Sequence, residues 1–289
     1  MNKELQAVID LLSLEQIEDN LFRGESHDIG APQVFGGQIL GQALSAASQT
    51  VDDRAPHSLH AYFLRPGDFN HPVVYQVERS RDGRSYSNRR VVAVQHGRPI
   101  LNLAASFHHP EPGFDHQETM PDVAGPDGLT PSIEIQAAVI DQVPEKMRRL
   151  LAHRPPFEFR PVEPPKFLEP AARPARKHVW MRAWNPLPDE PALHRNLLAY
   201  VSDYELLGTA TLPHDLDFAR RPVQMASIDH ALWFHRSFRV DDWLLYAFDS
   251  PSNFGGRGYS RGQIFTGDGS LIASVAQEGV IRPWNPPTS

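Results

Sequence analysis

The chain contains no cysteine, and that absence removes several kinds of chemistry at once. Disulfide bonds, thiolate nucleophiles and cysteine-ligated zinc are all excluded. Long apolar stretches are also missing, since no run approaches the roughly eighteen residues that a helix needs to span a bilayer. Residues 1–22 carry charges throughout and lack the apolar core of a secretion signal. We therefore expect a cytoplasmic protein.

Positive charge is scarce as well, because the chain carries a formal net charge of −7. Nonspecific binding to nucleic acid or to an anionic membrane is therefore not expected. An anionic substrate would need a local basic patch. Five arginines are candidates for it, although we favour a solvated strand face as their interpretation: Arg79, Arg81, Arg84, Arg89 and Arg90.

Signatures of metal and nucleotide sites are absent from the sequence. His57 and His60 lie three positions apart and His108 and His109 are adjacent, but no carboxylate–histidine set has the spacing of metal ligands. Neither a phosphate-binding loop nor a dinucleotide-binding glycine fingerprint occurs. The sequence thus predicts a protein without a metal ion or other cofactor.

Two parts of the chain repeat each other. Four blocks recur in the same order, each 171 to 173 positions after its counterpart. Such a nearly constant offset indicates two copies of one module. The matched blocks are Phe63–Arg65 with Phe234–Arg236, Val73–Glu78 with Leu244–Asp249, Gly83–Ser87 with Gly256–Ser260, and His96–Ser106 with Asp268–Glu278.

Each copy combines strand signals with one weakly charged helix. β-Branched and aromatic residues separated by short turns predict adjacent antiparallel strands. Residues 34–51 contain no charge, and residues 196–212 contain two, Asp203 and Glu205. Helices with so few charges must be largely enclosed, because a surface helix carries a charged face. A curved antiparallel sheet wrapped around a central helix is the hotdog arrangement, so the sequence predicts an α+β double hotdog.

The repeat also sets the expected domain boundaries. The first hotdog occupies residues 1–115 and the second occupies residues 154–289. Residues 116–153 form a linker that begins with a Pro/Gly-rich stretch and continues as a surface helix interrupted at Pro144.

The stretch Gly258-Tyr259-Ser260-Arg261-Gly262 fits the G-x-S-x-G pattern of a nucleophile elbow. That elbow requires a strained turn from a strand into a helix. Here the following residues instead predict a strand, an Asp268-Gly269 turn and a further strand. The repeat places Ser87 at the equivalent position, without the flanking glycines. We therefore interpret Ser260 as a strand serine beside a bulge or a close backbone contact.

Polar residues found in only one copy are the best candidates for chemistry. Asp203 lies in the second weakly charged helix, and the first such helix has no acid. Ser227 stands where the first copy has Pro56, and Gln277 stands where it has Ala105. Buried carboxylates and amides need a partner or a function. Taken singly, each has a structural alternative: a carboxylate that binds a backbone end, a loop serine and an edge-strand glutamine.

Asp229 and His230 are rival candidates beside Ser227. Strand alternation predicts Ser227 and Asp229 on one face of the sheet and His230 on the other. A further candidate is the glycine pair Gly36-Gly37 at the start of the first central helix. Free backbone N–H groups there can polarise a carbonyl oxygen.

Several motifs occur in a characteristic order along the chain, among them QVFGGQ, YFLRPGD, RDGRSYSNRRV, ASIDHALWFHR, RGYSRGQIFT and LIASVAQEGV. On these motifs the chain resembles the acyl-CoA thioesterase II family of double-hotdog enzymes. The resemblance implies hydrolysis of fatty acyl-CoA without a metal or redox cofactor, by a homodimer or homotetramer. It also implies a catalytic aspartate, hydroxyl residue and glutamine, which match Asp203, Ser227 and Gln277. Ser227 departs from the threonine common in the family and lacks the methyl group that restricts χ1.

A thioester needs little help with its leaving group, because a thiolate is a stable anion. We therefore expect Asp203 to act as general base on one water molecule that Ser227 and Gln277 orient. Direct attack by Ser227 is an alternative, although no histidine is placed by a motif to activate it. Two other functions stay open: a hotdog hydratase or dehydratase acting on acyl thioesters, and a non-catalytic acyl-CoA sensor.

Overall fold

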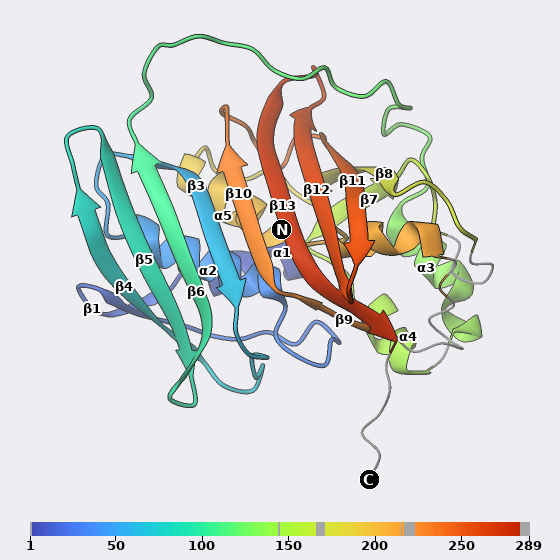
Figure 1. Cartoon of the computed structure of the whole chain (residues 1–289), viewed down its shortest axis with the longest axis horizontal. Helices are drawn as coiled ribbons and strands as arrows, with labels where there is room; N and C mark the ends of the chain where they lie inside the picture. The colour runs from blue at the N-terminus through green and yellow to red at the C-terminus, as the bar shows by residue number, and fades with distance from the viewer. Residues whose placement is uncertain (1, 144, 166–170, 215, 217–222, 284–289) are drawn as a thin grey trace.

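The computed structural model describes the chain except residues 1, 144, 166–170, 215, 217–222 and 284–289 (Figure 1). The helices are α1 (Lys3–Leu12), α2 (Gly36–Ser48), α3 (Ser132–Val139), α4 (Glu145–Leu151) and α5 (Pro191–Val201), with 3₁₀ turns η1 (Ile140–Gln142) and η2 (Leu207–His214). The strands of the first half are β1 (Glu15–Glu18), β2 (Leu21–Gly24), β3 (Ala55–Phe63), β4 (Val73–Asp82), β5 (Tyr86–Gln95) and β6 (Arg98–His108). Those of the second half are β7 (Phe157–Pro161), β8 (Arg176–Ala183), β9 (Val223–Ser227), β10 (Asp229–Phe234), β11 (Leu244–Phe254), β12 (Arg257–Thr266) and β13 (Leu271–Pro283).

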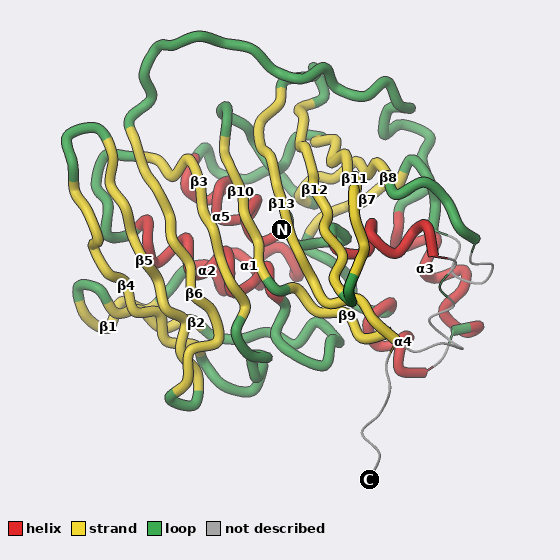
Figure 2. The backbone as a smooth tube through the Cα atoms, in the orientation of Figure 1, coloured by secondary structure: helices red, strands yellow, loops and turns green. Residues whose placement is uncertain are grey.

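The strands form one curved antiparallel sheet in the order β1-β2-β4-β5-β6-β3-β10-β13-β12-β11-β8-β7, and β9 pairs with β13. Strands β3 and β10 join the two halves at the centre of this sheet. The helices α2 and α5 lie behind the sheet, and residues 109–131 arch over its upper end (Figures 1 and 2). No helix in the described residues is long and apolar enough to cross a membrane.

The two central helices pack against each other through glycines of α2. A Cβ atom added to Gly37 would lie 2.1 Å from the carbonyl oxygen of Tyr200, and one added to Gly41 would lie 3.1 Å from that of Asn196. Both carbonyl oxygens belong to α5. Because a side chain would separate the helices, this contact requires glycine on α2.

The second central helix begins and ends earlier than the sequence predicted, since α5 runs from Pro191 to Val201 rather than over residues 196–212. Proline is accepted in a first helical turn, where no N–H is needed. After the helix, Glu205 takes a left-handed conformation with φ of 64°. Lys177 Nζ stabilises that turn by donating to Glu205 O at 2.9 Å and Glu205 Oε2 at 2.7 Å. Asp203 therefore lies in the turn beyond the helix.

The strand register corrects one block of the repeat. Arg89 pairs with Ala105 across β5 and β6, and Ser260 pairs with Gln277 across β12 and β13. Since Gln277 stands where the first half has Ala105, the residue equivalent to Ser260 is Arg89. The assignment of Ser87 to that position was wrong by two residues, because sequence similarity around the glycines does not reveal which residues face each other.

The G-x-S-x-G stretch forms part of β12, as the sequence predicted, and not a nucleophile elbow. Its glycines flank Ser260 on the buried face of the strand. A Cβ added to Gly258 would lie 2.7 Å from Ala210 Cβ in η2, and one added to Gly262 would lie 2.2 Å from the ring of Tyr246. The glycines thus let η2 and Tyr246 pack directly on the strand.

Two further expectations concern the surface. Arg89 is only 2% exposed, so its predicted place on a solvated strand face was wrong. The other four arginines of that set, Arg79, Arg81, Arg84 and Arg90, are exposed. In the linker, the predicted surface helix consists of α3 and α4 joined by η1, and Pro144 lies outside the described residues. The proposed boundaries at residues 115 and 154 stay a prediction.

Candidate active site

The structure brings the three predicted residues together. Gln277 Nε2 donates a hydrogen bond to Asp203 Oδ1 at 2.6 Å and another to Ser227 Oγ at 3.0 Å. Asp203 comes from the turn after α5, Ser227 from the end of β9 and Gln277 from β13. The glutamine amide therefore bridges a carboxylate and a hydroxyl that lie 24 positions apart in the sequence.

The carboxylate of Asp203 lies at the N-terminus of α2. Its side chain is only 6% exposed, and Oδ2 would be 2.6 Å from a Cβ added to Gly36. Burial raises the pKa of Asp203, while hydrogen bonds from Gln277 and from the Gly37 N–H act in the opposite direction. The partial positive charge of a helix N-terminus also favours the ionised carboxylate. The site therefore holds a carboxylate that is both ionisable and more basic than an exposed aspartate.

His230 is the functional candidate whose position the sequence did not predict correctly. Its side chain is fully buried, and its Nδ1 lies 3.3 Å from Gln277 Nε2 and 3.8 Å from Asp203 Oδ1. It therefore faces the same site as Ser227. The predicted alternation fails because Ile228 lies between β9 and β10, where its N–H donates to Glu278 O and its carbonyl accepts from Phe63 N.

The hydrogen bonds around His230 indicate its protonation state. Ser202 Oγ donates to Ala199 O at 3.0 Å, so it accepts from His230 Nε2–H, 2.9 Å away. The Nδ1 atom then carries a lone pair toward Gln277. Burial lowers the pKa of His230 to about 3, so the ring is neutral near pH 7. His230 thus presents an acceptor atom beside Gln277, whose two amide N–H groups already point to Asp203 and Ser227.

Asp229, the other rival candidate, is committed elsewhere. Its Oδ1 accepts a hydrogen bond from the Glu278 N–H at 2.6 Å. Burial raises the pKa of Asp229, and that hydrogen bond lowers it. This contact connects the start of β10 to β13, and it does not reach Asp203 or Ser227. Asp229 therefore does not join the group of residues around Gln277.

Unpartnered polar atoms occur at the site and elsewhere in the fold. Within the described residues, four buried side-chain atoms lack a hydrogen-bond partner: His57 Nε2, Thr209 Oγ1, Ser260 Oγ and Gln277 Oε1. Ser260 and Gln277 face each other across β12 and β13. Thr209 lies in η2, which packs against the same two strands. Polar atoms in this corner of the sheet are therefore available to hydrogen-bond a bound water molecule or ligand.

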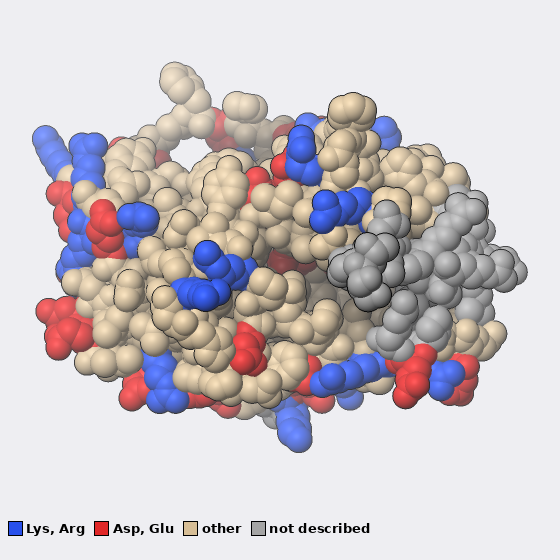
Figure 3. Space-filling view, turned by 60° about the horizontal axis from the view of Figure 1, so that its bottom comes forward, with Lys and Arg blue, Asp and Glu red and all other residues tan. Residues whose placement is uncertain are grey.

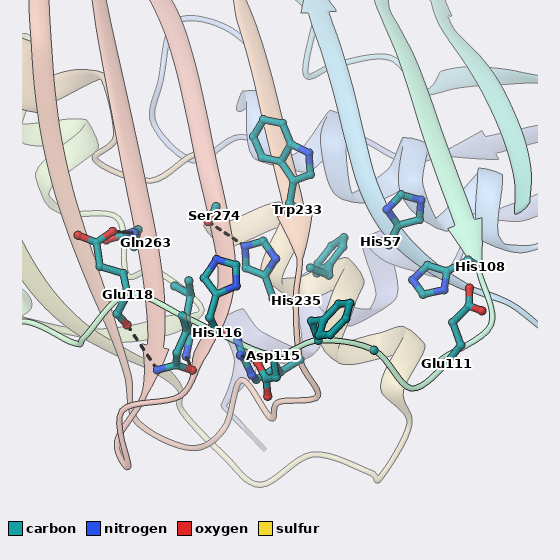
Figure 4. Close-up of a pocket in the computed structure, with 16 residues that line it drawn as sticks. His57, His108, Glu111, Asp115, His116, Glu118, Trp233, His235, Gln263 and Ser274 are labelled. Atoms are coloured by element: carbon teal, nitrogen blue, oxygen red, sulfur yellow. Dashed lines mark hydrogen bonds and ion pairs between the residues drawn. The ribbon is translucent and has the colours of Figure 1, made fainter.

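The described part of the surface is hollowed in more than one place. Figure 3 shows the lower end of the molecule, which is hollowed near its centre, with acidic side-chain atoms visible inside and basic side chains nearby. A second cleft of about 1000 Å³ lies between residues 111–118 and the outer face of the sheet, where Trp233, His235 and Ser274 are found (Figure 4). None of the residues that line this second cleft belongs to the group around Gln277.

Comparison with known proteins identifies the family. The model "Acyl-CoA thioesterase N-terminal domain" matches residues 23–108, and the model "Acyl-CoA thioesterase" matches residues 155–280. The chain is 44% identical to acyl-CoA thioesterase 2 of Haemophilus influenzae, over 98% of this chain and 99% of that protein. The chain belongs to the acyl-CoA thioesterase family.

Solved structures agree with this assignment. The crystal structure of the acyl-CoA thioesterase II TesB2 from Mycobacterium marinum is 40% identical, with a TM-score of 0.77, and the match covers 98% of this chain and 100% of that one. A hot dog fold protein from Alicyclobacillus acidocaldarius is 20% identical with a TM-score of 0.76, covering 96% and 98% of the two chains, and shows the fold alone. The predicted family, double-hotdog fold and thioester hydrolase class are confirmed.

Proposed function

We propose that this member of the family hydrolyses fatty acyl-CoA to a free fatty acid and coenzyme A, and that Asp203, Ser227 and Gln277 carry the reaction. One observation supports the site most strongly. The Gln277 amide donates to both Asp203 Oδ1 and Ser227 Oγ, so side chains from three separate segments meet around one point. Such a fixed arrangement suits the orientation of a single reacting water molecule.

Asp203 serves as the general base in this proposal. It takes a proton from water while the water oxygen attacks the thioester carbonyl carbon. The C–S bond then breaks, the carbonyl re-forms and coenzyme A leaves as a thiolate, which takes up a proton. Burial raises the pKa of Asp203 and so strengthens it as a base. The N-terminus of α2 favours its ionised form before the reaction.

Ser227 and Gln277 orient the water. Ser227 Oγ accepts a hydrogen bond from Gln277 and donates to no partner within the described residues, so its proton can point toward the water or the carbonyl oxygen. Gln277 Oε1, which has no partner among the described residues, is available as an acceptor. The Gly37 N–H is engaged with Asp203, so Gly36 is the member of the glycine pair that we propose as an oxyanion donor.

Attack by water is favoured over attack by Ser227. A serine nucleophile needs a base within hydrogen-bond reach. His230 has one ring nitrogen bonded to Ser202 and the other facing Gln277, and its pKa is lowered to about 3 by burial. Intact-protein mass spectrometry during turnover checks this point. No acyl adduct is expected on the wild type, and an acyl group on Ser227 would replace water attack with covalent catalysis.

The remaining parts of the proposal rest on the resemblance to the family. We propose that the protein acts in the cytoplasm, in fatty acid metabolism, as a homodimer or homotetramer and without a cofactor. Its proposed substrate is an acyl-CoA. We propose that basic side chains of the kind seen beside the hollow in Figure 3 attract the phosphates of coenzyme A.

The experiment that tests the function measures thiol release from a panel of short- to long-chain acyl-CoAs with a thiol-reactive dye. Release that is proportional to enzyme, with the free acid as the second product, supports hydrolysis and ranks the chain lengths. Folded protein that binds the esters intact would indicate a sensor. Hydration of an enoyl-CoA without thiol release would indicate a hydratase.

A further inference from the structure

A second cluster of chemically reactive side chains lies in the first half of the chain, apart from the residues around Gln277. Asp68 and His71 belong to the loop between β3 and β4, and His96 belongs to the turn between β5 and β6. One ligand atom from each of the three residues lies within 4.8 Å of the other two. Among the described residues, this is the one group of three histidine, cysteine or acidic side chains with that spacing.

The distances within the cluster approach those of a metal site. His71 Nδ1 lies 2.7 Å and His96 Nε2 lies 3.1 Å from the same oxygen, Asp68 Oδ2. Ligand atoms about 2.0–2.1 Å from a tetrahedral ion are roughly 3.3 Å apart from each other. Small side-chain rotations therefore suffice to place an ion between the two rings and the carboxylate.

The two loops that carry the cluster are fixed by a buried glutamine. Gln95 accepts from the Asp68 N–H at 2.7 Å and donates to the carbonyl oxygens of Asp68 at 2.7 Å and His71 at 2.8 Å. Gln95 is only 5% exposed. The backbone positions of the ligands are thus held before any ion arrives, which reduces the entropic cost of binding.

The ligand types of the cluster also suit a cation. Asp68 Oδ1 accepts hydrogen bonds from the backbone N–H and side-chain amide of Asn70, which leaves Oδ2 facing the two imidazole rings. Neutral imidazole is a preferred ligand of zinc, copper and nickel. His71 and His96 are each 55% exposed, so an ion in solution can reach both rings.

We propose that Asp68, His71 and His96 form a surface site for a divalent transition-metal ion, with Zn²⁺ as the expected occupant. The three side chains supply two nitrogen ligands and one oxygen ligand, and water completes the coordination. This site is separate from the proposed hydrolytic site and does not depend on it. Sequence spacing did not reveal it, because His96 is 25 positions from His71 and reaches it only through the pairing of the strands.

Calorimetric titration of the purified full chain with zinc chloride, in a buffer that does not bind metals, tests the site. We expect one Zn²⁺ per chain in the wild type. His71→Asn and His96→Asn should each weaken binding at least tenfold, and asparagine tolerates the φ of 50° at position 96. His109→Asn is the matched control, because its Nε2 lies 3.5 Å from Asp53 Oδ2 in a pair without a second imidazole.

Thermal melting supplies a second readout that does not depend on turnover. Zinc should raise the melting temperature of the wild type and of His109→Asn, and should leave His96→Asn unchanged, because a ligand stabilises only the fold that binds it. Melting of each variant without zinc confirms that it is folded. Absence of stoichiometric binding in the wild type, or equal binding by His96→Asn, would overturn the proposal.

Discussion

The two halves place different residues at the same position beyond their central helices. In the first half, Thr50 lies two residues after α2 and receives a hydrogen bond from Arg89 Nε at 2.8 Å. In the second half, Asp203 lies two residues after α5 and receives one from Gln277 Nε2 at 2.6 Å. The long side chain comes from β5 in the first case and from β13 in the second. Its cross-strand partner is small each time, Ala105 or Ser260.

The two arrangements differ in what they leave unpaired. Arg89 donates to Thr50 Oγ1 and O, to Asp82 Oδ1, and to the carbonyl oxygens of Arg81 and Asn88. All parts of its guanidinium group are therefore engaged. In the second half, Gln277 Oε1 and Ser260 Oγ have no partner within the described chain. We infer that the first half uses this position for stability, and that the second uses it for chemistry.

Asp203→Asn should have the largest effect on activity. The variant keeps the size of the side chain and removes the base, so turnover should fall by about 10²–10⁴-fold. Steady-state thiol release checks this. Asp82→Asn is the control in the first half, since Asp82 is the carboxylate beside Arg89, and it should keep wild-type turnover. A tenfold loss or less in Asp203→Asn would remove Asp203 from the chemical step.

Gln277→Ala should lower kcat by about 10–10³-fold, because Asp203 and Ser227 lose their common donor and the water loses its orientation. The KM should change little if Gln277 contacts the water rather than the acyl chain. Steady-state kinetics separate the two constants. A raised KM with unchanged kcat would place Gln277 in substrate binding instead.

Arg89→Met tests the opposite half. The substitution leaves the oxygens of Thr50 and Asp82 without their donor, so the free energy of unfolding should fall by about 2 kcal/mol. Turnover per folded molecule should not change. Denaturant unfolding measures the stability of the variant, and thiol release from the same preparation measures its turnover. A large loss of kcat in a folded Arg89→Met protein would contradict the division of roles between the halves.

Ser260→Ala should have a smaller effect. Its hydroxyl faces Gln277 across the strands and is the donor nearest in register to the unpaired Oε1. Neither atom has a hydrogen-bond partner among the described residues, so we expect the hydroxyl to bond only when water or substrate is present. Loss of one such hydrogen bond of about 1 kcal/mol corresponds to roughly a fivefold fall in kcat. Ser87→Ala is the matched control, because Ser87 is a buried strand serine that accepts from Arg54 in the first half. Equal effects of both variants would show that Ser260 has no special role.

The pH dependence of stability should show the smallest effect. Because burial raises the pKa of Asp203, the folded protein holds this proton to a higher pH than the unfolded chain does. Ionisation of Asp203 therefore lowers stability as the pH rises from the unfolded pKa through the folded pKa. Asp203→Asn should melt at a higher temperature than the wild type near neutral pH, with no difference below about pH 4. A wild type that is the more stable protein at pH 8 would contradict this sign.

The pH dependence of activity should also reflect the Asp203 carboxylate. Stability decreases as the pH rises, whereas activity should decrease as the pH falls. As the pH falls through the folded-state pKa of Asp203, the base becomes protonated and kcat should decline. His230 contributes nothing near neutrality, because burial lowers its pKa to about 3.

The duplicated sequence was enough to select Asp203, Ser227 and Gln277. Asp203 is an acid where the matching helix has none, and Ser227 and Gln277 are polar where the other copy has Pro56 and Ala105. It also predicted the central helix over residues 34–51, of which α2 occupies Gly36–Ser48. It predicted the strand that contains Ser260. These features follow from local composition and from similarity between the copies. The catalytic roles of the three residues stay a prediction.

Other features depend on pairing that the sequence does not display. Ile228 interrupts the alternation between β9 and β10, so His230 turns toward Gln277 and not away from it. Helix α5 ends at Val201, and the left-handed turn at Glu205 beyond it contacts Lys177, 28 positions upstream. The equivalence of Arg89 and Ser260 needs the register of the sheet. Such long-range contacts carry no periodic signal along the chain.

Binding stoichiometry tests the central difference between the halves most directly. A non-hydrolysable thioether analogue of acyl-CoA, titrated into the wild type by calorimetry, reports how many sites each chain contains whatever its oligomeric state. We predict one analogue per chain, because only the second half has the open polar group around Gln277. Two equivalent analogues per chain would mean that the half closed by Arg89 also binds substrate, and would contradict the account.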